Sequence, residues 1–176
     1  MIQKYYNVFS SNDLDLIWKY LMENKWQFGH VSLPSSNKKF WSMNFDEEIF
    51  FYEHLFNKIK NIIGQNYTLQ TVYANGHTYG MEGEFHLDSP DINGFTFLYY
   101  PHYKWKKSWN GCTTILIDEE NFEMVYPTPN SAIMFPSLLW HRSEPVSREF
   151  YDLRVTIAFK IIKNDNKFSS STGLFF

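Results

Sequence analysis

The spacing of apolar residues changes near residue 66. Before that point they recur at intervals of three and four, which places them on one face of a helix. The first such stripe follows the capping residues Ser10–Asp13 and consists of Leu14, Ile17, Trp18, Leu21 and Met22. The second lies between Asn44 and Gly64 and consists of Phe45, Ile49, Tyr52, Phe56, Ile59 and Ile63. The pattern predicts two amphipathic helices, with short strands at Gln3–Phe9 and Trp26–Leu33.

From Tyr67 onward, apolar and polar residues alternate, which is typical of strands with one buried face. Turn residues such as Asn75-Gly76 and Asn110-Gly111 separate the alternating runs. The predicted strands are Tyr67–Tyr73, Glu84–Asp88, Gly94–Tyr100, Thr113–Ile117, Glu123–Tyr126, Ala132–Phe135, Leu139–Arg142 and Leu153–Ile162. Helices followed by many short strands predict an α+β, mainly β, domain with a jelly-roll-like double sheet.

The last predicted strand has the clearest division into two faces. One face carries Arg154, Thr156, Ala158 and Lys160, which are small or polar and suit the wall of a cavity. The other face carries Val155, Ile157, Phe159 and Ile161, which suit packing beneath the N-terminal helices. The strand at 95–100 repeats this logic, with Thr96, Leu98 and Tyr100 on one face and Phe95, Phe97 and Tyr99 on the other.

Length and composition favour one folded domain over 1–176. The 176 residues are 44% hydrophobic and include 17 Phe, 12 Tyr and 6 Trp. We expect a helical support region at 1–66, a β core at 67–162 and a polar tail at 163–176. A formal net charge of −3 gives no electrostatic case for a nucleic acid or an anionic membrane as partner. These properties leave the oligomeric state open.

Two further observations indicate a cytoplasmic protein. The single cysteine, Cys112, excludes an internal disulfide and fits a reducing compartment. The chain shows no signal-peptide pattern and no run of about 18 apolar residues, so we expect neither export nor a membrane span.

Candidate chemistry centres on two histidines and one aspartate. His86 and Asp88 are two apart on a predicted strand, so their side chains point to the same side. His141, on a distant strand, would complete the two-histidine, one-carboxylate ligand set of a non-haem Fe(II) site with open coordination positions. Arg154 lies 13 residues further on and offers a rigid fork for a carboxylate. Together they suggest an iron oxygenase that uses a dicarboxylate co-substrate.

A short H-x-D sequence is also a common accidental match, and a histidine in a strand more often packs in the core or faces solvent than binds a metal. The other four histidines have no convergent partner in the sequence, so we expect structural or surface roles for them. They are His30, His54, His77 and His102.

Four segments, read together, resemble one protein family. They are Phe85–Asp88, Phe97–Trp105, Trp109–Thr113, and a final region that contains Phe135-Pro136-Ser137, His141, Pro145-Val146 and Leu153–Lys160. These segments are similar to the H-x-D, the tyrosine-ended strand with its following Trp, the W-G-G-E-T turn, and the distal histidine and arginine region of the Fe(II)/2-oxoglutarate-dependent dioxygenases, in their prolyl-4-hydroxylase-like branch. The similarity extends from about Tyr73 to Ile162. Pro101-His102 and Cys112 depart from the family pattern at positions that shape the rim of the site.

The resemblance implies a double-stranded β-helix with iron held by His86, Asp88 and His141. It implies 2-oxoglutarate and O2 as co-substrates, with ascorbate a candidate requirement for full activity, and with succinate and CO2 as products. Arg154 would bind the C5 carboxylate of 2-oxoglutarate, with contacts from Thr156 and Tyr100. Asp88 favours hydroxylation over halogenation, because related halogenases have a small residue there. The residues assigned to the substrate side, which could equally be packing residues, are Tyr73, Tyr79, Trp105 and Trp109.

The resemblance favours a prolyl residue of a protein or peptide as substrate, and leaves a small molecule open. An AlkB-like nucleic-acid dealkylase is a weaker alternative, because Lys160 stands where the second arginine of that branch's R-x5-R pattern would fall. A non-enzymatic jelly-roll binding module is a third reading, since fold alone does not establish function.

Overall fold

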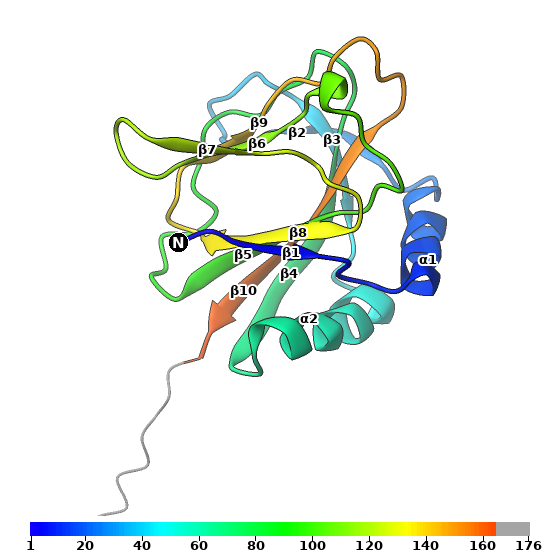
Figure 1. Ribbon diagram of the computed structural model, residues 1–176, viewed down its shortest axis with the longest axis vertical. Coiled ribbons are helices and arrows are strands. Elements are labelled where there is room, and N and C mark those ends of the chain that lie inside the picture. The colour runs from blue at the N-terminus through cyan, green and yellow to red at the C-terminus, as the bar shows by residue number, and fades with distance from the viewer. Residues whose placement is uncertain (165–176) are drawn as a thin grey trace, which may run out of the picture.

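Two antiparallel sheets form the architecture of the computed structural model, which describes residues 1–164 (Figure 1). The large sheet has the order β1 (Gln3–Tyr6), β8 (Ser131–Pro136), β5 (Gly94–Tyr100), β10 (Arg154–Lys163), β4 (Tyr67–His77), β3 (Phe40–Asn44) and β2 (Gln27–His30). The small sheet has the order β7 (Phe122–Val125), β6 (Thr113–Leu116) and β9 (His141–Ser143). The predicted fold class, mainly β with two packed sheets, is confirmed. Residues 165–176 of the predicted tail lie outside the described residues.

Helices cover the face of the large sheet that points away from the small sheet (Figure 1). Helix α1 (Ser11–Leu21) begins at the predicted cap, where Ser10 and Asp13 form a reciprocal capping box. Helix α2 (Phe56–Ile63) continues directly from a π-helical turn, η1 (Phe50–Leu55). A 3-10 turn, η2 (Lys107–Trp109), follows β5. None of the helices in the described chain is long and apolar enough to span a bilayer.

The second helix starts later than its apolar spacing predicts. Phe40–Asn44 forms β3, which pairs with β2 and β4, and the helical segment begins only at Phe50. The Asn44 side chain accepts a hydrogen bond from the Asp46 amide at 2.7 Å. Pairing with β4 satisfies the backbone of β3, so the sheet takes precedence over the local helical pattern.

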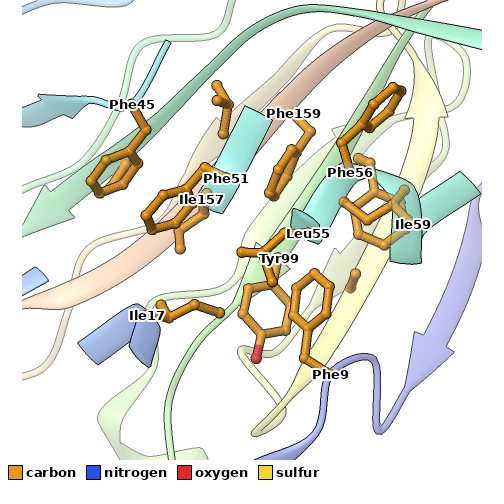
Figure 2. Close-up of a cluster of buried hydrophobic side chains, with 14 of the residues drawn as sticks. Phe9, Ile17, Phe45, Phe51, Leu55, Phe56, Ile59, Tyr99, Ile157 and Phe159 are labelled. Atoms are coloured by element: carbon orange, nitrogen blue, oxygen red, sulfur yellow. The ribbon is translucent and has the colours of Figure 1, made fainter. Parts of the chain in front are cut away.

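The main core lies between the helices and the large sheet (Figure 2). The apolar face of β10 packs there as predicted, with Val155, Ile157, Phe159 and Ile161 each at most 1% exposed. Phe51 stacks on Phe45 with ring centroids 3.9 Å apart. A second apolar cluster joins the two sheets and includes Ile115 and Val125 of the small sheet. The two cores hold the sheets at a fixed separation around the polar face of β10.

The predicted turn at Asn75-Gly76 is wrong, because β4 continues through both residues to His77 and pairs with β10 on one side and β3 on the other. Gly76 allows close packing here: a Cβ at this position would lie 2.6 Å from the Cδ2 of Leu153. The glycine allows the Leu153 side chain to approach β4 closely and does not reverse the chain.

The predicted strand Glu84–Asp88 does not form. Within it only His86 makes a ladder contact, a bridge to His141 in which each residue's amide donates to the other's carbonyl at 3.1 Å. The Asp88 amide donates to the Ser137 carbonyl at 3.0 Å. These few backbone bonds hold the segment against the start of β9 and against Ser137, which follows β8.

Candidate metal and co-substrate site

The bridge between His86 and His141 brings the three predicted metal ligands together. His86, Asp88 and His141 each offer a ligand atom, and these atoms all lie within 4.8 Å of one another. His86 Nε2 is 3.4 Å from Asp88 Oδ1, and His141 Nε2 is 3.3 Å from Asp88 Oδ2. The side chains of Asp88 and His141 are almost fully buried, at 4% and 8% exposure. The sequence spacing thus produces one compact cluster.

The tautomers of both histidines follow from their hydrogen bonds. His86 Nδ1 lies 2.9 Å from the Glu84 carbonyl, and His141 Nδ1 lies 2.9 Å from the Leu139 carbonyl. A carbonyl only accepts, so each Nδ1 carries a proton, and each ring in its neutral form turns the lone pair of Nε2 toward Asp88. Two nitrogen lone pairs facing a carboxylate repel it unless a cation lies between them. This donor set fits a divalent transition metal, with the backbone carbonyls orienting the ligands.

Two further side chains contact the carboxylate of Asp88 at its Oδ2. Its Oδ2 accepts a hydrogen bond from Thr96 Oγ1 at 2.5 Å and forms an ion pair with Lys160 Nζ. Burial raises the pKa of Asp88, but the positive charge of Lys160 outweighs it and holds that pKa well below its usual range. Asp88 is therefore ionised near neutral pH and has its Oδ1 directed at His86.

Arg154 lies at the start of β10 and is 1% exposed. Its Nε donates to the Gly111 carbonyl at 2.9 Å, and its Nη2 donates to Thr113 Oγ1 at 3.3 Å. Among residues 1–164 no carboxylate pairs with it, and burial lowers its pKa. A buried guanidinium without a counter-ion is costly unless an anion joins it, so this position fits an anionic ligand.

One cavity of about 50 Å³ connects the metal cluster with Arg154. The polar face of β10 forms its floor, as the alternation of that strand predicts, from Arg154 at one end to Lys160 beside Asp88 at the other. Its lining residues include Tyr73, Asn75, His77, His86, Asp88, Thr96, Thr113, His141, Ser143, Arg154, Thr156 and Lys160. The cavity thus combines a metal-ligand cluster with an uncompensated cation.

The overall structure matches known enzymes, although the sequence matches no family model and no curated protein. An oxidoreductase of the 2OG-Fe(II) oxygenase family from Burkholderia pseudomallei superposes with a TM-score of 0.72 at 9% identity, over 93% of this chain and 86% of that one. The chain has the fold of the 2OG-Fe(II) oxygenases.

Two other solved structures with this fold differ in what they bind. A prolyl hydroxylase from Trichoplax adhaerens, in complex with a peptide of hypoxia inducible factor, superposes with a TM-score of 0.69 at 17% identity, over 92% of this chain and 83% of that one. HygX from Streptomyces hygroscopicus, with nickel, 2-oxoglutarate and hygromycin B bound, gives 0.63 at 9% identity, over 92% and 82%. The predicted double-stranded β-helix is confirmed, and these neighbours include a prolyl hydroxylase.

Within this oxygenase fold, the predicted co-substrate residues fall into two groups. Thr156 lines the cavity beside Arg154. Tyr100 is fully buried and lies one side chain further back, where its hydroxyl donates to Thr113 Oγ1 at 2.8 Å. Thr113 also accepts from Arg154, so it is Thr113 that stands between Tyr100 and the cavity.

The predicted substrate-side residues are spread more widely. Tyr73 lines the cavity, next to Lys160. Tyr79 is 52% exposed and lies against Arg148, outside the cavity lining. Trp105 and Trp109 pack together with Phe150 in a separate aromatic cluster. Only Tyr73 among the four lines the cavity that contains the metal cluster.

Several cavity residues were not predicted as functional. The alternation predicts only that Lys160 and Thr96 lie on polar strand faces, whereas in the structure both contact Asp88. The sequence predicts a turn at Asn75 and a structural or surface role for His77, yet both line the cavity from β4. Continuing the alternation from Tyr73 through Asn75 to His77 would have identified this face. His54 and His102 lie outside the cavity lining: His54 pairs with Asp13, and His102 Nε2 accepts a hydrogen bond from the Val155 amide.

Proposed function

We propose that this protein is an Fe(II)- and 2-oxoglutarate-dependent dioxygenase that hydroxylates an unactivated C–H bond. The observation that carries the proposal is the single cavity with His86, Asp88 and His141 at one end and, at the other, the buried Arg154, which has no carboxylate partner within residues 1–164. Metal binding at the first end and carboxylate binding at the second suit a 2-oxo dicarboxylic acid that bridges them. HygX, which shares the fold, contains a metal and 2-oxoglutarate.

Some of the cavity residues would bind the metal and the co-substrate, and others would position the metal ligands. His86 and His141 would hold iron through Nε2, and Asp88 would hold it through Oδ1 while Thr96 and Lys160 fix the other oxygen. Arg154 would bind the C5 carboxylate, with Thr156 beside it. Iron and the oxo acid supply O2 activation, and the overall reaction converts substrate, O2 and 2-oxoglutarate into hydroxylated substrate, succinate and CO2.

For the substrate we propose a prolyl residue of a protein or peptide. The similarity of the sequence motifs to prolyl hydroxylases supports it, as does the shared fold with an enzyme that binds a peptide. A small molecule is the second candidate, because HygX shares the fold and contains hygromycin B. Nucleic-acid dealkylation is disfavoured for two reasons. Lys160, at the position of the second arginine in the R-x5-R pattern, forms an ion pair with Asp88 inside the cavity, and the chain has a net charge of −3.

Succinate release tests the reaction class. The wild-type protein is incubated with Fe(II), 2-oxoglutarate, ascorbate and air, with His86→Ala and an anaerobic sample as controls. We expect succinate only from the wild-type protein in air. An equal amount of succinate from His86→Ala would show that the proposed ligand set is wrong. Mass spectrometry of proline-rich peptides from the same reaction tests the substrate, through a gain of about 16 Da, the mass of the one oxygen atom that hydroxylation adds.

A further inference from the structure

Four polar side chains form a square on the cavity face of two neighbouring strands. On β10 the square contains Arg154 and Thr156, and their direct cross-strand partners on β4 are His77 and Asn75. All four line the cavity. Side chains of such pairs stand about 5 Å apart, close enough for one small anion to touch members of both strands.

Two atoms of this square lack the partners that buried polar atoms normally have. Within residues 1–164, His77 Nδ1 and Asn75 Oδ1 are buried and accept or donate no hydrogen bond. His77 is 2% exposed, so solvent reaches little of it. A buried polar atom without a partner destabilises a fold, and two such atoms at one end of one cavity indicate that a ligand normally supplies the partners.

We propose that His77 and Asn75 form, with Arg154 and Thr156, the binding site for the distal carboxylate of the oxo acid. The proposal rests on the proposed function and adds two residues on β4 to it. His77 would donate from Nδ1, and the Asn75 amide can turn to present its NH2 group. The β4 pair would make the site selective for a dicarboxylate over a monocarboxylate of similar length.

The surroundings of His77 support a donor at Nδ1. Its Nε2 lies 2.9 Å from Ser143 Oγ, and a serine hydroxyl can donate to it. The ring stacks on Phe40 at 4.7 Å between centroids, which fixes its plane. Burial and the nearby charge of Arg154 lower the pKa of His77 well below its usual value. The ring is therefore neutral, and when Ser143 donates to Nε2, the one ring proton is on Nδ1.

Two substitutions of His77 separate binding from structure. Asn places an amide nitrogen near the position of Nδ1, whereas Gln places one near Nε2 and keeps the contact with Ser143. Wild type, His77→Asn, His77→Gln and Asn75→Ala are loaded with Mn(II), which does not turn over, and titrated with 2-oxoglutarate by calorimetry. A parallel titration uses 2-oxobutyrate, which lacks the distal carboxylate. Mn(II) affinity and thermal unfolding are recorded for each variant.

We expect His77→Gln to weaken 2-oxoglutarate binding roughly 10- to 100-fold, the effect of a lost hydrogen bond to a charged group. His77→Asn should retain affinity within about fivefold, Asn75→Ala should lose about three- to tenfold, and 2-oxobutyrate binding should be unchanged throughout. Unchanged 2-oxoglutarate affinity in His77→Gln overturns the inference. Equal losses in Asn and Gln variants, or equal losses for both oxo acids, overturn it as well. A wild-type protein that binds Mn(II) but no 2-oxoglutarate would instead refute the proposed function.

Discussion

Lys160 places a positive charge against one of the three proposed metal ligands, and this charge should weaken metal binding. Its Nζ forms an ion pair with Asp88 Oδ2 and lies 3.3 Å from Thr96 Oγ1. Burial lowers the pKa of Lys160, but Tyr73 and Asp88 together raise it above its usual value, so the ammonium group is charged at neutral pH. We predict that Lys160→Met binds Mn(II) and Co(II) more tightly than the wild type.

The magnitude follows from Coulomb's law. A divalent ion on the other oxygen of the same carboxylate would lie about 5 Å from the ammonium nitrogen. The repulsion is then about 1.7 kcal/mol at the dielectric constant of water and about 6.6 kcal/mol at an effective value of about 20. Removing Lys160 also leaves Asp88 buried without its cation, which a metal then compensates. Thr96 still orients Oδ2, so we expect at least about a tenfold gain in affinity.

Calorimetric titration of metal-free protein with Mn(II), at fixed pH and salt, measures this directly. Lys160→Arg keeps the charge and should stay near the wild-type affinity, while Thr96→Val removes only a neutral donor and should not tighten binding. Metal-free Lys160→Met should unfold at a lower temperature, since a buried ion pair is broken, and should gain more from Mn(II) than the wild type. Equal or weaker Mn(II) binding by Lys160→Met would refute the charge argument.

Three other predictions concern Arg154, the buried histidines and Gly76. Arg154→Ala should raise the 2-oxoglutarate concentration needed for half-maximal succinate release at least about tenfold, with little change in the iron requirement, because a buried charged partner is lost; equal shifts for both would contradict its role. Burial and Arg154 lower the pKa of His102 to about 3 and that of His77 well below its usual value, so below about pH 5.5 these two side chains bind about two more protons in the unfolded chain than in the native one. Their contribution to stability therefore falls as pH falls, by about 2.7 kcal/mol per unit between roughly pH 5.5 and 4.5, which urea unfolding at several pH values would measure and which His77→Asn should halve. Gly76→Ala would place a Cβ 2.6 Å from Leu153 and should cost about 1–3 kcal/mol, and adding Leu153→Ala should remove most of that penalty in a double-mutant cycle.

Residue alternation was enough to predict β5, β8 and β10 within one or two residues and to assign the two faces of β10. The ligand cluster could be predicted because two of its members lie two residues apart on an extended segment. Alternation could not show that Asn75-Gly76 remains in a strand, because that pair is typical of turns and only the close approach of Leu153 explains the glycine. The roles of Lys160 and Thr96 depend on contacts between strands, which no local pattern contains.

A bulge in β4 changes which of its side chains face the core and which face the cavity. The pairing of β10 with β4 shifts between Lys160 and Ile161, so that Thr71 and Leu69 pair with successive residues and Gln70 is extra. Leu69 packs in the same core as Val72 and Ala74, three and five positions later, whereas a regular strand would place Leu69 on the opposite face from both. The bulge thus lets β4 bury Leu69 beneath the helices and still direct Tyr73, Asn75 and His77 into the cavity. It lies beside Lys160, so the cavity end that contains the metal cluster coincides with the point where β4 changes face.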